Sequence, residues 1–431
     1  MNVVNIIGCG PTGMTIAWEL SKHSKVHVYD RKPGPGGSWW EPDERRDLHS
    51  YRAVFDRCFI NTRDLLREMG LRWSDYFGSI DNQSPYPTMF KMLGLKDYWE
   101  LTKLSTMVLL HPGVYKTKTL KESIGNLSPD GEKFISSLPY VMDGVSWDTM
   151  TAFEFVKSFD WVALSNHQTQ IVSGAKMFKD MEQALRRRGV TFHYNTEILG
   201  VRYGRVDHEA FLVDTDETIT GDLLVLAVDN QPAKWLMGEN WGPQAPNSLS
   251  TYQCVTFTIS YSHDMKLPPD VVGLVKTPWH ILASVLVDRK TICVVLTDLT
   301  TPSPVTGRSV SVTPPEELVE EVYRQSNLPR GVVHFCWGAE WNGSRWVHNQ
   351  SSGVLSTKGQ IPFWGRCPSV ALCGMMSPRN TPFASIEAAV EVGRRFVGVK
   401  PLRPLLITEL LIGVLLLVIL KHLMTKFRVG S

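Results

Sequence analysis

The start of the chain combines two short apolar runs with one amphipathic stretch. Residues 3–7 form an apolar run with the length of a buried strand, and residues 26–29 form a second run that leads to Asp30. Between them, apolar residues recur at helical spacing from residue 14 to residue 20. This order predicts a strand, a helix and a second strand, which together make the βαβ unit of a parallel sheet.

The turn between the first strand and the helix reads Gly8-Cys9-Gly10-Pro11-Thr12-Gly13. In such a turn the first glycine allows a tight bend, the second lets backbone amides approach a pyrophosphate, and the third lets the helix pack on the strand. The helix N-terminus supplies N–H groups and a positive dipole end for phosphates. Asp30 stands where an acid accepts hydrogen bonds from a ribose. The pattern predicts a dinucleotide site whose candidate cofactor-binding residues are Gly8, Gly10, Pro11 and Gly13.

Later segments of the chain either continue this strand-and-helix pattern or have a different composition. Residues 170–201 read as a helix followed by strands, and residues 222–228 as another buried strand. Residues 75–170 lose the strand rhythm and are rich in aromatics, whereas residues 251–299 carry β-branched runs that predict an antiparallel sheet. We therefore predict a discontinuous cofactor-binding domain over 1–75, 170–245 and 360–398. A substrate-binding domain is predicted over 76–169 and 246–359.

Two further motifs follow the first one. The first is Gly36-Gly37, shortly after Asp30. The second is a strand at residues 369–374 that ends in glycine, followed after a loop by a helix at residues 385–395 that begins with Glu-x-Ala. With residues 170–201, these blocks resemble the FAD fingerprints of the flavin-containing amine oxidase and phytoene desaturase superfamily. The resemblance implies an α/β fold, in which an FAD-binding Rossmann-type (GR2-like) domain is interleaved with a mixed α+β substrate domain.

The same resemblance implies roles for single positions. The backbone at Ile198 would contact the adenine, and the helix N-terminus at Ser385 would face the flavin pyrimidine ring. The sequence departs from the family pattern in having Ser38 where Arg is usual and Met375 where an acid is usual. It also has no clear counterpart of the active-site Lys. Because Gly353 is followed by Val354 where covalent members have Cys, FAD is expected to bind non-covalently.

Composition narrows the class of protein. The chain has 431 residues and a formal net charge of +2, so its bulk electrostatics do not favour nucleic acid as a partner. Its 7 cysteines are scattered without C-x-x-C spacing, which fits reduced thiols better than disulfides or a zinc site. No basic segment precedes the first apolar run, so no secretory signal is expected.

The C-terminal stretch is almost wholly apolar. Residues 410–420 are uninterrupted by polar side chains, and cations flank the stretch on both sides. We predict a tail-anchor transmembrane helix over 402–424, as in monoamine oxidases, with the catalytic body on the cytoplasmic side. The alternative is an apolar helix packed on the protein core. The expected localisation is therefore a membrane, with a single pass.

The sequence shows one dinucleotide fingerprint, whereas a flavin monooxygenase normally shows a second for NADPH. We therefore expect an FAD-dependent oxidase or dehydrogenase that takes hydride from an amine or a lipid-like substrate onto flavin N5. Two alternatives stay open: a non-redox flavin enzyme resembling UDP-galactopyranose mutase, and a lipid- or protein-binding protein on the same fold, as Rab GDP-dissociation inhibitors are. The sequence does not indicate an oligomeric state.

Candidate catalytic residues come from aromatic density and from one titratable group. Trp337, Trp341 and Trp346 precede the closing motif and are predicted to supply a wall beside the flavin ring, with Trp337 or Trp341 as the direct contact. Trp39 and Trp40 follow Gly37 and compete for this role. His49 is the nearest titratable group to that loop and is a candidate base. Each of these residues has an ordinary packing role as its alternative.

Overall fold

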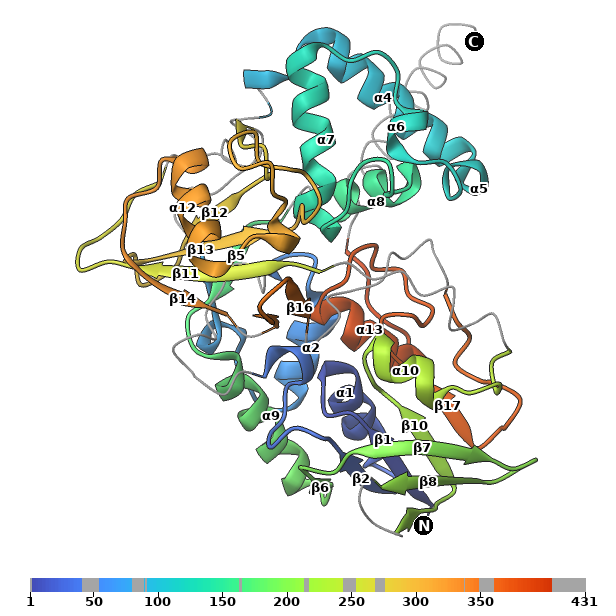
Figure 1. Cartoon of the computed structure of the whole chain (residues 1–431). Helices are drawn as coiled ribbons and strands as arrows, with labels where there is room; N and C mark the ends of the chain where they lie inside the picture. Colours follow the sequence, from blue (N-terminus) through green and yellow to red (C-terminus); the bar gives the residue numbers. More distant parts are fainter. Residues whose placement is uncertain are drawn as a thin grey trace, which may run out of the picture.

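A computed structural model of the chain describes residues 2–40, 54–79, 89, 91–162, 165–212, 217–242, 253–267, 276–336, 338–348 and 360–404. Figure 1 shows three bodies of secondary structure: a lower α/β body that contains the N-terminus, an upper helical body, and a lateral body built on an antiparallel sheet. Four sequence predictions rest on residues outside those described. They concern His49, Trp337, the Gly353-Val354 pair behind non-covalent FAD binding, and the predicted anchor beyond residue 404.

A five-stranded parallel sheet forms the centre of the lower body, in the order β17-β10-β1-β2-β6. β1 lies in the middle, and Ile6 pairs with Val28 on one side and with Val225 on the other. Such a central strand is mostly apolar because both faces of the sheet are covered. The exception is the buried Asn5, whose side-chain amide donates to the carbonyl oxygen of Thr220 at 3.0 Å. The strands are β1 (Val3–Ile7), β2 (Lys25–Tyr29), β6 (Thr191–His193), β10 (Leu223–Leu226) and β17 (Val370–Leu372).

Helices cover this sheet and tie distant parts of the chain together. α1 (Pro11–Leu20) packs against α13 (Ile386–Phe396) and α9 (Gly174–Arg187), and α13 also contacts α2 (Ile60–Glu68). A small antiparallel sheet of β7 (Ile198–Tyr203), β8 (His208–Leu212) and β9 (Thr218–Ile219) lies beside the parallel one, with α10 (Asn230–Leu236) against β7. The sheet strands fall inside the predicted ranges 1–75, 170–245 and 360–398, so the α/β prediction is confirmed as a fold class.

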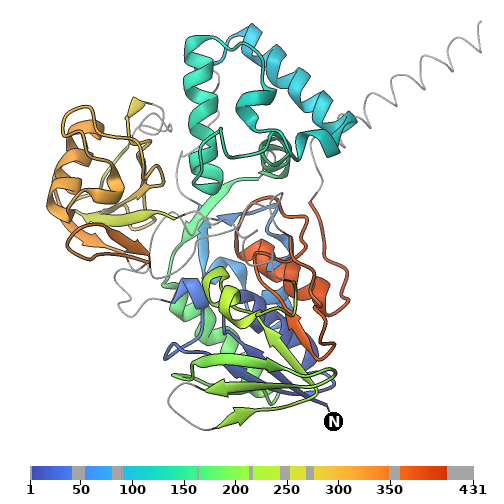
Figure 2. The same cartoon turned by 45° about the vertical axis from the view of Figure 1, so that its right-hand side comes forward.

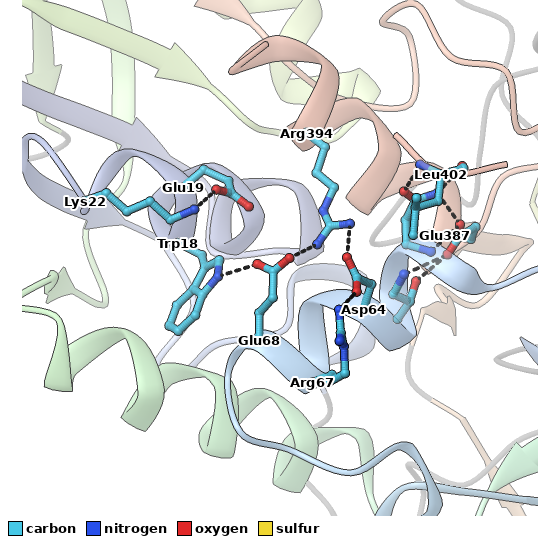
Figure 3. A network of polar contacts seen from close by, with 11 residues as sticks. Trp18, Glu19, Lys22, Asp64, Arg67, Glu68, Glu387, Arg394 and Leu402 are labelled. Carbon is cyan, nitrogen blue, oxygen red and sulfur yellow. Dashed lines mark hydrogen bonds and ion pairs between the residues drawn. The ribbon is translucent and has the colours of Figure 1, made fainter. Parts of the chain in front are cut away.

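Figure 3 shows polar contacts that join α1, α2 and α13. Arg394 of α13 is 2% exposed and donates to Asp64 and Glu68 of α2, at 2.8 Å each. Glu68 also accepts a hydrogen bond from the indole N–H of Trp18 on α1. Asp64 is further paired with Arg67. A buried guanidinium with two carboxylates keeps its charge compensated, so the three helices are held in one relative position.

The upper body is helical and has its own core. It consists of α4 (Leu95–Leu110), α5 (Pro112–Tyr115), α6 (Leu120–Ser123), α7 (Pro129–Asp143) and α8 (Ala152–Val162). Leu104, Phe134 and Phe155 are buried at its centre. Ser128 caps α7 by accepting from Gly131 N–H, and Gly144 ends it in the left-handed conformation with φ 63°.

The lateral body is an antiparallel sheet of order β12-β13-β11-β14, as the β-branched runs predict. It contains β11 (Val255–Ser260), β12 (Leu282–Val285), β13 (Thr291–Leu296) and β14 (Val332–Phe335), with α12 (Pro315–Ser326) and the hairpin β15 (Ala339–Trp341) and β16 (Trp346–His348). A three-stranded sheet of β3 (Val54–Phe55), β5 (His167–Gln170) and β4 (Phe77–Ser79) lies among the three bodies (Figure 2). Short 3₁₀ turns occur at Gly37–Trp39, Trp73–Asp75 and Val310–Val312.

Among the residues that the structure describes, no helix combines the length and apolar character needed to cross a bilayer. The predicted anchor falls almost wholly beyond these residues, and only 402–404 of it are described. Those residues are fixed to the body. Leu402 exchanges two hydrogen bonds of 2.8 Å with the side-chain amide of Asn61 at the start of α2.

Candidate active site

A cavity of about 550 Å³ runs between the three bodies. Its lining begins at the glycine turn after β1 and passes the N-terminus of α13. It ends among apolar side chains of α7, α8 and the lateral sheet. A volume of this size is typical of small-molecule and cofactor sites. One continuous space therefore joins the predicted nucleotide motif to an apolar chamber.

The glycine turn is shaped so that side chains are excluded from it. Gly8 has φ 107°, and a Cβ there would lie 2.2 Å from the carbonyl oxygen of Ala227. Gly37 has φ 59°, and its Cβ would lie 2.9 Å from the Cα of Gly10. A substitution at either position would strain the backbone and force two segments apart. The Gly36-Gly37 pair and the first turn therefore meet, as the order of the sequence motifs predicts.

α1 starts at this turn with Pro11 in its first position and without a side-chain cap at Gly10. Pro needs no hydrogen bond for its backbone nitrogen, so the helix begins there without loss. The N–H groups of the first turn and the positive end of the helix dipole are available for an anionic ligand. Gly10, Pro11 and Thr12 all line the cavity.

Asp30 lies at the end of β2, on the cavity wall, and is 8% exposed. Its two carboxylate oxygens accept hydrogen bonds from the backbone N–H groups of Cys9, at 2.7 Å, and Lys32, at 2.8 Å. Burial raises the pKa of Asp30, although these hydrogen bonds oppose the effect. Each carboxylate oxygen has a second lone pair, so a hydroxyl donor can still bind. Asp30 therefore stabilises the turn and is also a candidate hydrogen-bond acceptor for a ribose hydroxyl.

Cations also border this end of the cavity. Lys32 donates from its ammonium group to the carbonyl oxygen of Gly37, at 2.6 Å, and its ammonium lies 5.5 Å from the centre of the Trp40 ring. Arg31 lies 3.6 Å from Glu197 on the opposite wall. Ile198, the predicted adenine contact, lines the same region. The site thus offers positive charge beside the glycine turn.

The N-terminus of α13 forms the middle of the cavity. Ser385 caps it by accepting from Ala388 N–H at 3.1 Å, and both Ser385 and Ile386 line the cavity. Ala384 N–H donates to Asp143 at the end of α7, with a distance of 3.4 Å. Burial, and next the charge of Glu154, raise the pKa of Asp143. This contact ties the helical body to the loop that leads into α13.

The chamber beyond α13 is enclosed by aromatic rings and holds one imidazole. The ring of Phe55 lies 5.7 Å from that of His167 and 6.3 Å from that of Phe383, and Phe59 stacks on Phe383 at 6.2 Å. His167 is enclosed, and burial lowers its pKa to about 4. The imidazole is therefore neutral near pH 7 and can accept one hydrogen bond and donate another.

Apolar side chains complete the chamber. Leu138, Val141 and Met142 of α7 form one wall together with Phe134 of the same helix. Phe159 and Val162 of α8 extend it, whereas Thr256, Leu282 and Ser284 contribute the side of the lateral sheet. The carboxylates among the described lining residues are Asp30, Glu197 and Asp229, all on loops of the lower body. The chamber itself is apolar with a few neutral polar groups.

The aromatic residues predicted from sequence have different positions. Trp341 pairs with Trp346 across the β15–β16 hairpin, with ring centres 5.9 Å apart, and neither is among the residues that line the cavity. Trp346 donates from its indole N–H to Thr313, inside the core of the lateral body. The position of Trp341 therefore gives no support to its predicted place beside the flavin. Trp39, the competing candidate, does line the cavity.

His167 was not identified by the sequence patterns. It begins a four-residue strand, and its cavity neighbours come from positions about 110 residues earlier and more than 200 residues later in the chain. No local periodicity connects such positions. The sequence indicates His167 only through its residue type, because it is a titratable imidazole at the start of a strand that leads into residues 170–201. His49 and Trp337 lie outside the described residues.

A dinucleotide fits the residues that are present. The bare glycine turn leaves room for a pyrophosphate, the helix N-terminus and Lys32 supply positive charge, and Asp30 supplies an acceptor for a ribose. The remaining length of the cavity leads past α13 to the aromatic chamber. This arrangement suits a cofactor whose nucleotide end is polar and whose other end is a flat ring.

Comparisons with known proteins agree with this fold. Residues 6–61 match the model of the NAD(P)-binding Rossmann-like domain. No curated protein sequence matches the chain. Putrescine oxidase bound to putrescine superposes with a TM-score of 0.63 and 13% identity, over 92% of this chain and 98% of that one.

Two further solved structures are similar. Cyclohexylamine oxidase from Brevibacterium oxydans IH-35A gives a TM-score of 0.62 at 13% identity, covering 91% of this chain and 97% of that one. An oxidoreductase from Methanosarcina mazei gives 0.62 at 12% identity, covering 92% and 100%. The chain shares the fold of these oxidases, and the resemblance predicted from sequence is confirmed at that level.

Proposed function

We propose that the protein is an FAD-dependent oxidoreductase that oxidises an apolar, lipid-like small molecule. The observation that carries the proposal is the single cavity, which joins a pyrophosphate-compatible glycine turn to an apolar chamber across the N-terminus of α13. Gly8, Gly10 and Gly37 would hold the diphosphate, Asp30 a ribose, and the Ile198 segment the adenine. The similar oxidases support this assignment through their shared fold.

Bound FAD supplies a two-electron acceptor at N5, which dioxygen or a quinone can reoxidise. The residues of this chain supply binding and orientation. Ser385 fixes the first turn of α13, whose positive dipole end then favours electron-rich ring positions beside it. The rings of Phe55, Phe59 and Phe383 exclude water from the chamber. His167 is the titratable group that we assign to orienting the substrate.

The chamber favours a neutral substrate over a charged amine. Moving an ammonium group into an apolar site costs several kcal/mol, which the roughly 2 kcal/mol from an aromatic face does not offset without a carboxylate. The cavity carboxylates belong to the nucleotide side, where Asp30 and Asp229 already accept backbone hydrogen bonds. Of the two substrate classes that the sequence leaves open, amines and lipid-like molecules, we therefore favour the second. An amine would have to enter as the free base.

Absorbance spectroscopy of the purified full-length protein tests the proposal directly. We expect a flavin spectrum, release of FAD into the supernatant after acid precipitation, and anaerobic bleaching by an apolar unsaturated lipid but not by a diamine. Bleaching by a short charged amine instead would contradict the assigned substrate class. Stoichiometric flavin that no substrate bleaches, combined with tight lipid binding, would favour the non-catalytic binding protein.

Residues 402–424 are proposed to anchor the protein in a membrane, with the catalytic body on the cytoplasmic side. The support is the uninterrupted apolar run at residues 410–420 and the cations on both sides of it. The hydrogen bonds between Asn61 and Leu402 add a structural reason, because they hold the residue from which this tail starts against α2. These two hydrogen bonds would fix the orientation of the catalytic body relative to the bilayer.

A further inference from the structure

Two consecutive helices of the upper body expose large apolar side chains. On α4, Leu95 is 91% exposed, Trp99 66% and Leu110 65%, and on α5 Val114 is 49% exposed. α4 and α5 contact each other, so these side chains belong to one surface, which we call the α4–α5 face. Contiguous exposed apolar surface of this kind usually marks an interaction site.

The exposed residues follow helical periodicity, which shows that they form a stripe. Five positions of α4 are spaced four, three, four and four residues apart, and all are exposed: Leu95, Trp99, Thr102, Thr106 and Leu110. The opposite side of the same helix carries Leu104 and Val108, which are buried in the core of the upper body. α4 therefore exposes apolar side chains at both ends of this stripe, with threonines between them, on the side that its own fold does not cover.

The charges around the stripe are predominantly positive. Lys91, Lys96 and Lys103 are exposed on or beside α4, and Lys116, Lys118 and Lys121 are exposed at and after α5. Acids offset only part of this charge. Lys103 is paired with Glu100 and Lys121 with Asp148, and Glu122 is exposed, whereas Asp97 is buried and accepts hydrogen bonds from Gly94 and Ser128. An exposed Trp and Leu stripe with a lysine border is the composition of helices that lie in an anionic membrane surface.

The α4–α5 face is connected to the cavity through its own body. Met89 lines the cavity six residues before Leu95, the most exposed large apolar residue of the described chain. α4 packs on α8, which contributes Phe159 to the chamber wall. The helical body therefore presents one apolar surface to the outside and another to the chamber. In Figures 1 and 2 this body lies at the opposite end of the molecule from the β7–β8 hairpin.

We propose that the α4–α5 face lies in the headgroup region of an anionic bilayer, as a second membrane contact besides the tail. The proposal rests on the proposed function in one respect: it assigns the source of the apolar substrate, which would reach the chamber from the bilayer through the helical body. The occupant is lipid because the lysine border complements anionic headgroups, and because 27 residues with an apolar centre follow residue 404.

The test measures lipid contact at α4 in the full chain. Cys254 is partly exposed whereas the other six cysteines are buried, so a Cys254→Ser background permits labelling at a single introduced thiol. Thr102→Cys, carrying an environment-sensitive fluorophore, reports on the stripe without removing an apolar side chain. Val206→Cys is the matched control, since Val206 is 69% exposed in the turn between β7 and β8.

The protein is placed in nanodiscs that contain phosphatidylserine, with and without spin-labelled lipid. We expect a blue shift and loss of fluorescence by spin-labelled lipid at position 102, and neither at position 206. Adding Leu95→Asp and Leu110→Asp should abolish the quenching at 102, and Lys91→Glu with Lys96→Glu should reduce it. Absence of quenching at 102 would overturn the proposal. A blue shift at 102 without quenching by spin-labelled lipid would show that protein covers the face instead.

Flavin content is measured on the same samples from their visible absorbance. Lipid contact at position 102 does not require FAD, so a protein that is quenched there but colourless would retain the membrane face while refuting the proposed function. A yellow, active protein without quenching would refute the membrane face alone. The two failures are therefore separable.

Discussion

The carboxylate of Glu387, in the first turn of α13, caps the N-terminus of α2 by accepting the backbone N–H of Asn61 at 2.9 Å. It also accepts the N–H of Thr62 at 2.9 Å and both side chains, so four donors converge on one buried acid. α2 has no capping side chain of its own at Phe59. Glu387, on α13, therefore stabilises the N-terminus of α2 and couples the cavity end of α13 to Phe59 in the chamber.

Removal of this acid should loosen both helices. Burial raises the pKa of Glu387 to about 7 despite its four hydrogen bonds. In Glu387→Gln only one of the two oxygens remains as an acceptor. The NH₂ group that replaces the other oxygen would face the donors of either Asn61 or Thr62. We expect a loss of roughly 1–3 kcal/mol of unfolding free energy at pH 8, measured by urea denaturation. Glu391→Gln is a matched comparison, because Glu391 also accepts backbone N–H groups but caps a loop instead of α2.

The same residue predicts a pH dependence. The folded pKa of Glu387, about 7, lies above the usual value of 4.5, so the folded protein binds a proton that the unfolded chain has already released. This contribution to stability is complete below pH 4.5 and is lost as the pH rises through about 7. The difference in unfolding free energy between pH 5 and pH 8 should therefore shrink in Glu387→Gln. An unchanged pH profile would show that Glu387 titrates normally.

The nucleotide half of this protein could be predicted from sequence because its signals are local. Gly8, Gly10 and Gly13 follow a strand within a few residues, and their spacing reports directly on the turn that they form. The closing helix has a similarly local signature, and Ser385 caps it as the motif implies. Such short-range patterns do not depend on how the remainder of the chain folds.

The chamber could not be predicted in the same way. Its walls come from Phe55 and Phe59 before α2, from α7, α8, His167 and the lateral sheet, and from the loop before α13. The neighbouring rings of Phe55, His167 and Phe383 are each separated by more than 100 residues of sequence. Aromatic density near residue 341 indicated a site, yet a hairpin core uses the same residues, and Trp341 pairs with Trp346 there. The compositional signal for a ligand wall and for a small core is the same.

The glycine turn predicts a selective loss of cofactor. At Gly10 an added Cβ would meet only the Cα of Gly37, at 3.7 Å, so Gly10→Ala should fold but occupy space needed by a pyrophosphate. We expect FAD content to fall at least tenfold with little change in thermal stability of the flavin-free protein. Gly113→Ala is the control, since nothing lies within 4 Å of its added Cβ. Full flavin occupancy in Gly10→Ala would disprove the assignment of the turn.

Two deletions separate the roles of the tail. Removal of 405–431 keeps the hydrogen bonds between Leu402 and Asn61, whereas removal of 402–431 abolishes them. We expect both truncated proteins to be extracted from membranes by carbonate and to retain FAD. The longer deletion should also unfold at a lower temperature, because Asn61 loses two buried hydrogen bonds. Retention of the shorter deletion in carbonate-washed membranes would exclude the tail as the sole anchor.

The buried guanidinium of Arg394 should be among the least replaceable side chains of the α/β body. It donates to Asp64 and Glu68 while only 2% exposed, so its loss leaves Glu68 without its cation and Asp64 with Arg67 alone. Arg394→Met is expected to cost about 3–5 kcal/mol of unfolding free energy. Arg395→Met serves as the neighbouring control, since Arg395 is a third exposed and its pair with Glu391 spans 3.5 Å. Urea denaturation of both variants provides the comparison.

His167 provides the sharpest test of the chamber. Its neutral imidazole lies beside Phe55 and lines the cavity beyond α13, so it is placed to hydrogen-bond a substrate without contacting the nucleotide motif. His167→Phe keeps a ring in the same space but removes both polar atoms. We expect unchanged FAD content and flavin reduction slowed by about 10- to 100-fold, the loss of one or two substrate hydrogen bonds. Phe55→Leu, which changes the packing and keeps the imidazole, is the control.

The pH profile distinguishes orientation by His167 from proton abstraction. Because burial lowers its pKa to about 4, the imidazole is already neutral throughout pH 6–9, and its titration should not appear in the rate of flavin reduction there. The profile of His167→Phe should therefore run parallel to that of the unmodified protein, displaced to lower rates. An acidic limb, on which the rate rises with pH, that disappears in the variant would show instead that His167 takes a proton from the substrate, with a pKa raised by the bound ligands.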